Sequence, residues 1–260
     1  MRQRLFIFGL GYTAARIAAA AEARGWEVVS TGRAGTLAFD DTGAVRLALA
    51  DADQVLSSVP PSADGDPVLA HYANALDGKP LSYLSSTGVY GDCGGAWADE
   101  SAPTGTGRRT ARSEADAAWL ERGARVLRLP GIYGPGRSAL DRVRAGRAQR
   151  IDLPGQVFSR VHVDDIVGAA LLAFDAPPGA YNLADDLPAS QNAVIEAAAA
   201  LLGIAPPPMQ TLEQAQLSPQ ARGFYDENRR VTGGKAKRVL RWQLRYPTYR
   251  EGLRSLFAAR

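Results

Sequence analysis

Residues 4–14 read RLFIFGLGYTA, an apolar run that passes at once into a glycine-rich turn of the form G-x-G-x-x-A. The run Arg4–Phe8 predicts a buried strand, and the alanine-rich stretch Ala14–Arg24, closed by Gly25, predicts a helix. A second apolar run at Trp26–Ser30 predicts the next strand. Because two parallel strands must be joined by a crossover connection, this unit predicts an α/β protein with a parallel sheet.

The turn has the composition of a phosphate-binding loop. Gly9 permits a tight turn, Gly11 lets a pyrophosphate approach the backbone, and the small Ala14 lets helix and strand pack closely. The helix that follows presents free backbone N–H groups, at Tyr12 and Thr13, and the positive end of its dipole. The turn therefore predicts dinucleotide binding; the alternative is a glycine turn that binds no ligand.

Composition argues against several classes of protein. The chain has 260 residues with 46% hydrophobic side chains, which suits one α/β domain with a small lobe. A net charge of +3 gives no reason to expect nucleic acid, and no apolar run reaches membrane-spanning length. The first strand leaves no room for a signal peptide and Cys93 is the only cysteine, so we expect a cytoplasmic protein. The two histidines, His71 and His162, lie far apart, so no metal site is expected.

Strand and helix patterns alternate along the rest of the chain. Apolar runs predict further strands at Thr36–Asp40, Gln54–Val59, Leu81–Ser85, Arg125–Leu129, Val161–Val163 and Tyr181–Leu183. Helical spacing predicts helices at Ala44–Ala52, Val68–Leu76, Thr110–Glu121, Asp164–Phe174 (capped by Asp164) and Ala193–Leu202. Between them, residues 92–109 are rich in Gly, Pro, Ser, Thr and Asp, which predicts a long mobile loop.

Six short motifs occur in a familiar order. They are GLGYTA at 9–14, SSTGVYGD at 85–92, DESAPT at 99–104, RLPGIYGPG at 128–136, VHVDDI at 161–166 and YNLADD at 181–186. With them the chain resembles, over nearly its whole length, the extended short-chain dehydrogenase/reductases of the NAD-dependent epimerase/dehydratase group. Its compact length and the closing YPTYREGL at 246–253 look closer to a small atypical branch.

The resemblance implies a fold and a division into two parts. The fold is a doubly wound, Rossmann-like parallel sheet of about seven strands in the order 3-2-1-4-5-6-7. Residues 1–130 and 160–183 would form the dinucleotide-binding domain, and residues 131–159 and 184–260 a small C-terminal substrate lobe. A dimer interface is usual in the family, built from helices that correspond to Val68–Leu76 and Ala111–Leu120. A monomer and a homodimer both stay open.

The resemblance also implies an active site that is altered here. In the family a Ser or Thr before V-Y-G binds the reacting oxygen; that position is Ser86, with Thr87 beside it. A Tyr-x-x-x-Lys pair then moves the proton and holds the ribose, but residues 108–112 read RRTAR, so Arg108 replaces the Tyr and Arg112 the Lys. Asp116 falls where an acid usually stands.

Arginine changes what this site can do. Because Arg stays protonated, Arg108 cannot act as a general acid or base near neutrality, although it can stabilise an oxyanion as a fixed charge. Arg112 can still replace Lys on the ribose hydroxyls. Tyr90 is an alternative proton donor near the site; the competing interpretation is that it only packs at the mouth of the cleft.

The end of the second strand bears on the choice of nucleotide. NAD-binding proteins of this fold place an acid there, whereas this chain has Ser30, Thr31 and Arg33. A guanidinium pairs well with phosphate, which favours NADP(H); the alternative is a surface arginine in a turn. By resemblance, further cofactor contacts are expected from Asp40 on the adenine, from Ser58, Val59 and Pro60 on the ribose and adenine side, and from Pro130 and Gly131 at the nicotinamide.

Other residues have less specific signals. Arg137 and Arg160 are candidates for the substrate cleft, and His162 for a structural or a catalytic role. The basic segment from Asn228 to Arg260 suits either an anionic substrate or a solvated surface. The chain is thus expected to be an NADP(H)-dependent oxidoreductase or epimerase-like enzyme of a small-molecule substrate with a non-standard active site. The alternative is a catalytically silent NADP(H) sensor that signals through a partner.

Overall fold

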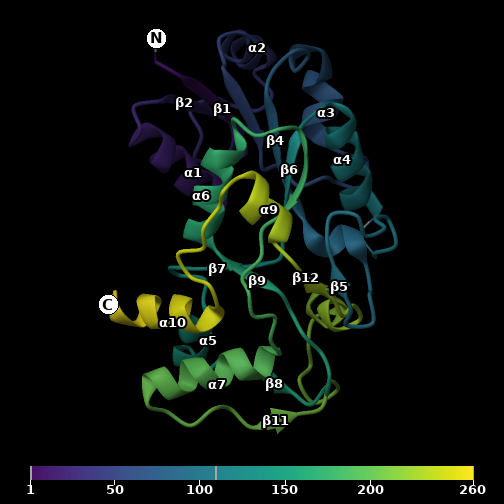
Figure 1. Cartoon of the computed structure of the whole chain (residues 1–260), viewed down its shortest axis with the longest axis vertical. Helices are drawn as coiled ribbons and strands as arrows, with labels where there is room; N and C mark the ends of the chain where they lie inside the picture. The colour runs from purple at the N-terminus through teal and green to yellow at the C-terminus, as the bar shows by residue number, and fades with distance from the viewer. Residues whose placement is uncertain (1, 109, 260) are drawn as a thin grey trace.

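The computed structural model of the chain describes residues 2–108 and 110–259. Its main sheet has six parallel strands in the order β10-β6-β4-β3-β1-β2 (Figure 1). The strands are β1 (Arg4–Phe8), β2 (Glu27–Ser30), β3 (Gln54–Ser57), β4 (Leu81–Ser86), β6 (Arg125–Leu129) and β10 (Gly179–Asn182). This arrangement confirms the predicted α/β, Rossmann-like fold.

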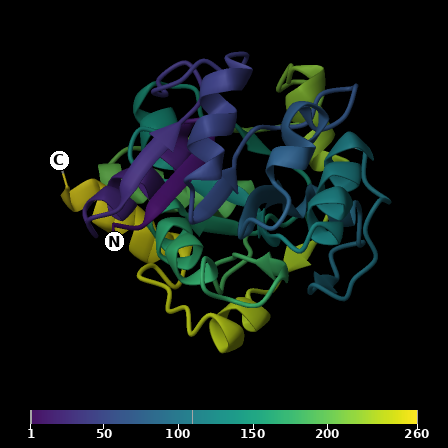
Figure 2. The same ribbon diagram turned by 90° about the horizontal axis from the view of Figure 1, so that it is seen from above.

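Helices cover both faces of this sheet, as Figure 2 shows from above. On one face lie α1 (Tyr12–Glu22) and α6 (Val163–Ala173), whose small Ala residues and Ile17 and Ile166 pack in one core. On the other lie α2 (Thr42–Ala50), α3 (Pro67–Tyr72), followed by η1 (Ala73–Ala75), and α4 (Thr110–Glu121). Because strands buried on both faces need apolar residues on both sides, β1 is apolar and buried at each position from Leu5 to Phe8.

The predicted third strand, Thr36–Asp40, is wrong. Within the described residues this segment makes only a single parallel bridge, between Thr31 and Leu37. The chain turns away directly afterwards because Asp41 caps α2 by accepting from the N–H of Ala44 at 3.1 Å. Phe39 does not continue a strand; its ring packs edge-on against that of Tyr72, and the two ring centroids lie 5.4 Å apart. The sheet therefore has six strands where about seven were expected, in otherwise the expected order.

A lobe at the carboxyl end of the strands has its own core (Figure 1). It contains α5 (Ala139–Arg144), α7 (Gln191–Leu202) and α10 (Tyr249–Ala258), with β8 (Arg150–Ile151) paired to β11 (Met209–Gln210). The short strands β7 (Gly131–Tyr133) and β9 (Arg160–His162) pair in parallel and connect it to the sheet. Helix α9 (Gly234–Val239) lies in the segment expected for the lobe, yet its Ala236 packs in the core of the main sheet.

A strap from the C-terminal part of the chain, residues 227–231, holds the described part of the expected loop, residues 92–108. Strand β12 (Arg230–Val231) pairs in parallel with β5 (Trp97–Ala98), which lies within that loop. The carbonyl oxygen of Asn228 accepts from the N–H groups of Cys93 at 3.0 Å and Gly95 at 2.8 Å. The strap is preceded by α8 (Pro219–Arg222) and η3 (Gly223–Tyr225). The expected loop is therefore tied to the C-terminal part of the chain along much of its length.

The cap of α6 differs from the prediction. Asp164 was expected to cap this helix, but it lies inside it, and His162 is the N-cap residue. The Nδ1 atom of His162 accepts from the N–H of Asp164 at 3.2 Å. Across the described ranges, every helix is too short or too polar to cross a bilayer.

Candidate active site

The glycine turn is closely packed on the loop that follows β3. Gly9 has φ of +80°, and a Cβ placed on it would lie 2.9 Å from Val59 Cγ2 and 3.3 Å from Ser58 Oγ. The hydroxyl of Ser58 donates to the carbonyl oxygen of Gly9, and the N–H of Gly9 donates to Thr31 Oγ1 at 3.2 Å. Only glycine fits there, for both conformational and steric reasons. The exposed Pro60 follows this contact.

Gly11 has a different reason to be glycine. It is the N-cap residue of α1 with φ of −89°, which any residue adopts, and a Cβ there would meet none of the described atoms within 4 Å. No side chain caps this helix, so the N–H groups of its first turn, from Tyr12 onward, have no capping partner. Thr13 and Ala14 are buried against the sheet. An open approach to uncapped N–H groups fits a pyrophosphate.

Arg33 lies on a tight turn after β2. The N–H of Gly35 donates to the carbonyl oxygen of Gly32 at 2.9 Å, and Gly32 has φ of +116°. Arg33 is exposed and has no hydrogen bond or ion pair with any residue in the described part of the chain. Its guanidinium is thus available to an anionic ligand. Of the two neighbouring hydroxyls, that of Thr31 is engaged by the glycine turn, and Ser30 is buried.

Asp40 is exposed on the turn that leads into α2. The strand that was expected to present it is absent, because the chain turns into the helix at this point. The residues that precede it still pack in the core through Phe39.

Ser86 ends β4 and is the N-cap residue of the short helix η2 (Thr87–Tyr90). Its Oγ accepts from the N–H of Gly88 at 3.1 Å, and it is only half-buried. Thr87 is buried. A Cβ placed on Gly88 would lie 3.3 Å from Ser86 Oγ and 3.9 Å from Arg229 Nη2. Ser86, at the position that the family uses for the reacting oxygen, and the Arg229 guanidinium of the C-terminal strap therefore both lie within 4 Å of the same point next to Gly88.

Tyr90 belongs to a buried polar network. Its hydroxyl donates to Asn182 Oδ1 at 2.8 Å and accepts from Arg128 Nη1 at 2.9 Å, and the residue is only 2% exposed. Arg128 also pairs in bidentate fashion with Asp116, which in turn accepts from Ser85 Oγ at 2.6 Å. Burial raises the pKa of Tyr90, an effect that outweighs the opposing charge of Arg128. These contacts favour the packing role of Tyr90 over that of a proton donor.

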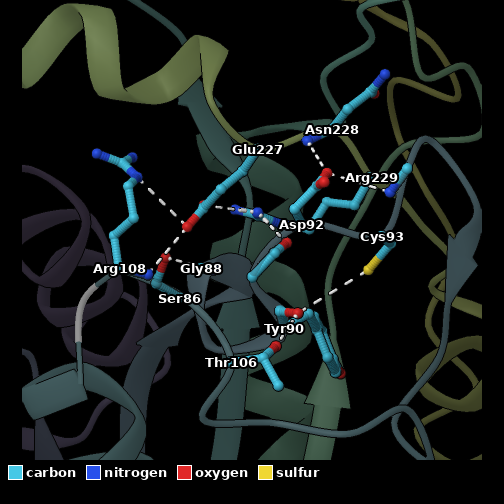
Figure 3. A network of polar contacts seen from close by, with 12 residues as sticks. Ser86, Gly88, Tyr90, Asp92, Cys93, Thr106, Arg108, Glu227, Asn228 and Arg229 are labelled. Atoms are coloured by element: carbon cyan, nitrogen blue, oxygen red, sulfur yellow. Dashed lines mark hydrogen bonds and ion pairs between the residues drawn. The ribbon is translucent and has the colours of Figure 1, made fainter.

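Arg108 is held by a carboxylate from the strap (Figure 3). Glu227 Oε1 accepts from the N–H of Arg108 at 3.1 Å and lies 3.4 Å from its Nε, while Oε2 accepts from Arg229 Nη1 at 2.8 Å. Burial of Glu227 opposes its ionisation, but the hydrogen bond from Arg229 and the contacts with Arg108 leave its pKa lowered. One ionised carboxylate thus joins the two guanidinium groups. Arg109, between Arg108 and the helix, lies outside the described residues.

Arg112 contacts the sheet. Its Nη1 donates to the hydroxyl of Tyr83 at 3.0 Å. The Tyr83 ring stacks on Trp119 with 5.3 Å between centroids, and burial raises the pKa of Tyr83 to about 12. Arg112 therefore lies on the face of α4 that packs on β4, one turn before Asp116.

The residues expected at the nicotinamide and substrate end lie around β7. Pro130 is half-buried at the end of β6, and Gly131 begins β7 by donating its N–H to Ser159 O at 3.2 Å. Tyr12 crosses from the glycine turn to this region, since its hydroxyl donates to Pro135 O at 3.1 Å. The exposed Arg137 lies over the Tyr12 ring, 5.1 Å from its centroid. These contacts connect the glycine turn with the loop that follows β7.

Arg160 lies inside the lobe. Its Nη1 donates to the carbonyl oxygens of Phe158 at 2.8 Å and Ala189 at 2.9 Å, and burial lowers the pKa of Arg160 to about 10. Asp185 is also buried, and burial raises the pKa of its carboxyl to about 7. Arg160 is thus engaged with backbone groups of the lobe.

His162 and Asp165 brace the lobe against the sheet. Burial lowers the pKa of His162 to about 4, and its ring lies 4.2 Å from that of Tyr246, centroid to centroid. Asp165 accepts from the N–H groups of Arg245 at 2.6 Å and Tyr246 at 3.2 Å. These contacts give His162 the structural role.

The remaining candidates lie apart from this chemistry. His71 is exposed, and burial raises the pKa of the Cys93 thiol, which argues against a nucleophile. Within the described ranges, no three His, Cys, Asp or Glu side chains gather into a metal-binding group. Sequence reasoning missed Glu227 and Arg229 as site residues. The signal available was the basic segment from Asn228 onward, for which an anionic substrate was one of two interpretations.

Three known proteins are similar to this chain over different lengths, and one of them covers nearly the whole chain. A functionally unknown conserved protein from Silicibacter pomeroyi DSS has a solved structure that is 38% identical, covers 99% of both chains and has a TM-score of 0.88. Protein YeeZ of Escherichia coli (strain K12) is 29% identical over 242 residues, covering 79% of this chain and 86% of that protein. A 3-diazoavenalumate denitrifying reductase from a Streptomyces species is 36% identical over 140 residues, which cover 49% of this chain and 45% of the reductase. No model of a known protein family matches the chain.

Solved structures of lower identity show the same fold. The human epimerase family protein SDR39U1 with NADPH is 18% identical, with a TM-score of 0.78 over 98% of this chain and 99% of that chain. The dTDP-glucose 4,6-dehydratase of Bacillus anthracis in complex with NAD is 14% identical, with a TM-score of 0.76 over 98% of this chain and 96% of that one. The fold implied by the six motifs is therefore confirmed.

Proposed function

Because the chain belongs to the same family as the conserved Silicibacter pomeroyi protein and has the fold of the NAD-dependent epimerases and dehydratases, we propose that it is an NADP(H)-dependent oxidoreductase of a small molecule. The observation that carries the proposal is the open, uncapped start of α1 at Gly11. The named function of the Streptomyces relative, a reductase, supports reduction as the reaction type. We also propose that the protein is cytoplasmic and that it is a monomer or a homodimer.

Different residues at the carboxyl end of the sheet would bind the nucleotide and the substrate. Gly9, Gly11 and the first turn of α1 would hold the pyrophosphate, and the nucleotide would supply hydride chemistry when bound. The unpaired Arg33 supports a 2′-phosphate and hence NADP(H) over NAD(H). Ser86 would bind the oxygen of the substrate, and Tyr12 and Arg137 lie where the loop after β7 closes the site.

The second candidate is an NADP(H) sensor without turnover. It is favoured by Arg108, which replaces the family's Tyr and is bound to Glu227. A site without a titratable donor loses the general acid–base contribution of about 10²- to 10⁴-fold, which leaves binding intact.

Titration calorimetry followed by a turnover assay tests both candidates. We expect micromolar or tighter binding of NADPH and its oxidation with at least one member of a panel of small carbonyl compounds and conjugated carbonyl compounds. NADPH binding with no oxidation by any panel member would favour the sensor. Absence of binding to NADPH and NADH alike would contradict both.

A further inference from the structure

Two hydrogen-bond donors flank the side of Gly88 on which a side chain would project. A Cβ placed on Gly88 would meet Ser86 Oγ at 3.3 Å and Arg229 Nη2 at 3.9 Å. Apart from Gly88 itself, its chain neighbours and the backbone of its own short helix, no other heavy atom of the described residues would lie within 4 Å of that Cβ. The serine hydroxyl and the guanidinium therefore lie on the side of Gly88 to which a Cβ would point, and a ligand oxygen that approaches Gly88 from that side would meet both donors.

Ser86 Oγ and Arg229 Nη2 each carry hydrogen that no acceptor among the described residues binds. Ser86 Oγ accepts from the N–H of Gly88 at 3.1 Å, which leaves its own hydrogen without an acceptor among the described residues. Arg229 uses Nη1 for the carbonyl oxygen of Gly91 at 2.6 Å and for Glu227 Oε2 at 2.8 Å. Its Nη2 has no hydrogen-bond partner in the described part of the chain. The contacts through Nη1 fix the guanidinium while Nη2 stays available (Figure 3).

We infer that Ser86 and Arg229 together form an oxyanion site, and that it takes an α,β-unsaturated carbonyl compound as hydride acceptor. The inference rests on the proposed function and names its substrate class. Glu227 is a positioning residue, because it reaches the substrate oxygen only through Arg229. The charge that the sequence suggested for Arg108 is supplied instead by a residue of the C-terminal strap.

The chemistry follows from the permanent charge of arginine. Reduction of a simple carbonyl leaves a localised alkoxide that needs a proton, and arginine is a poor proton donor near neutrality. Addition to a conjugated system leaves an enolate, whose delocalised charge a fixed cation stabilises without proton transfer. The substrate takes up a hydride at its β-carbon from the reduced nicotinamide nucleotide, which is left oxidised, and the C=C electron pair moves so that the oxygen becomes the enolate oxyanion. A proton from solvent then completes the saturated carbonyl compound.

Binding of 4-nitrophenol tests the site without turnover, because its phenolate is a delocalised oxyanion with a visible absorbance. In the wild-type protein, with and without NADP⁺, we expect the phenolate to bind more tightly than the phenol, so that the pKa of the bound phenol falls. Arg229→Gln should lower this preference about ten- to a hundred-fold, the equivalent of a charge-assisted hydrogen bond. Arg229→Lys should retain part of it.

Two further variants keep the test independent of misfolding. Arg230→Gln is the matched control: Arg230 is the next residue of the strap and also donates to a loop carbonyl, that of Gly95, but does not approach Gly88. It should leave the phenolate preference unchanged. Gly88→Ala retains Arg229 and places a methyl group beside Ser86 Oγ and Arg229 Nη2, where it would obstruct a ligand, so it should weaken binding of phenolate and phenol without unfolding the protein.

Several outcomes would overturn the inference. These are a wild-type protein with no preference for phenolate, equal losses in Arg229→Gln and Arg230→Gln, or a loss in Arg108→Gln as large as that in Arg229→Gln. In turnover assays, faster reduction of simple aldehydes than of conjugated carbonyl compounds would overturn it while leaving the proposed function intact. Failure to bind either nicotinamide nucleotide would instead overturn the proposed function.

Discussion

The hydroxyl of Tyr90 accepts a hydrogen bond of 2.9 Å from Nη1 of Arg128, and both side chains are buried between the sheet and its helices. The same hydroxyl donates to Asn182 Oδ1 at 2.8 Å. Arg128 is neutralised by the carboxylate of Asp116, at 2.6 Å. A tyrosine that belongs to the family's V-Y-G motif thus serves to join β6, η2 and β10, and its proton is engaged within that network.

Tyr90→Phe should therefore lower stability and not change the chemistry. Loss of the hydroxyl leaves a buried guanidinium N–H and a buried amide oxygen without a partner, which typically costs about 1–3 kcal/mol in the free energy of unfolding. Urea denaturation measures this change, and the pH dependence of turnover should stay as in the wild-type protein. Unchanged stability together with loss of an alkaline limb in the rate profile would show that Tyr90 is the proton donor after all.

Gly11→Val should abolish nucleotide binding in a folded protein. The backbone at Gly11 has φ of −89° and a Cβ there meets no described atom, so the substitution strains neither backbone nor packing. The branched side chain would occupy the approach to the N–H groups of α1. Calorimetry with NADPH measures the loss, and Ala19→Val, at an exposed position two turns along the same helix, is the matched control. Unchanged NADPH affinity in folded Gly11→Val would exclude this turn as the phosphate site.

Arg33→Ala should weaken NADPH binding and leave NADH binding almost unchanged. A charge-assisted hydrogen bond to a phosphate is worth about 1.5–3 kcal/mol, which corresponds to a loss of roughly ten- to a hundred-fold in affinity. Arg24→Ala, at another exposed arginine just beyond α1, controls for the change in net charge. If the variant loses equal affinity for both nucleotides, Arg33 does not bind the 2′-phosphate.

Asp185→Asn should stabilise the protein at neutral and higher pH. Burial raises the pKa of the Asp185 carboxyl from 3.8 to about 7, so the folded state retains its proton up to a higher pH than the unfolded state does. The protonated Asp185 carboxyl therefore makes its full contribution to the free energy of unfolding below about pH 4, and this contribution is lost as the pH rises through 7. The neutral Asn side chain does not ionise and so avoids this loss of stability. Since each unit of pKa shift corresponds to about 1.4 kcal/mol, the loss amounts to a few kcal/mol.

Denaturant unfolding of Asp185→Asn and the wild-type protein between pH 4 and 8 measures this effect. The difference in free energy of unfolding should grow as the pH rises over that range. Asp186→Asn is the control, because Asp186 is exposed and paired with Lys237. A difference between Asp185→Asn and the wild-type protein that is constant with pH would contradict the raised pKa.

Local patterns in the sequence were enough to predict the glycine turn at residues 9–14, the helix that follows it and most of the sheet. Strand periodicity, the G-x-G-x-x-A turn and the alanine-rich helix depend on residues within a few positions of each other, and α4 and β6 have the predicted bounds. The missing third strand shows where local patterns fail. Its apolar residues Leu37 and Phe39 are half-buried against the core, but Phe39 packs on Tyr72 and the Asp41 cap turns the chain into α2.

The surroundings of Ser86 were decided by tertiary structure alone. The sequence placed Ser86 directly after the predicted strand at Leu81–Ser85, and the resemblance placed Arg108 at the position of the family's tyrosine. The sequence by itself did not determine which cation lies beside that serine, because Arg229 contacts Gly91 across 138 positions of the chain and no local pattern reports such a contact. Pairing of β12 with β5 brings the strap to the site, and the two hydrogen bonds on Nη1 orient the guanidinium. The chemistry available at Ser86 is thus a product of packing between segments that are distant in sequence.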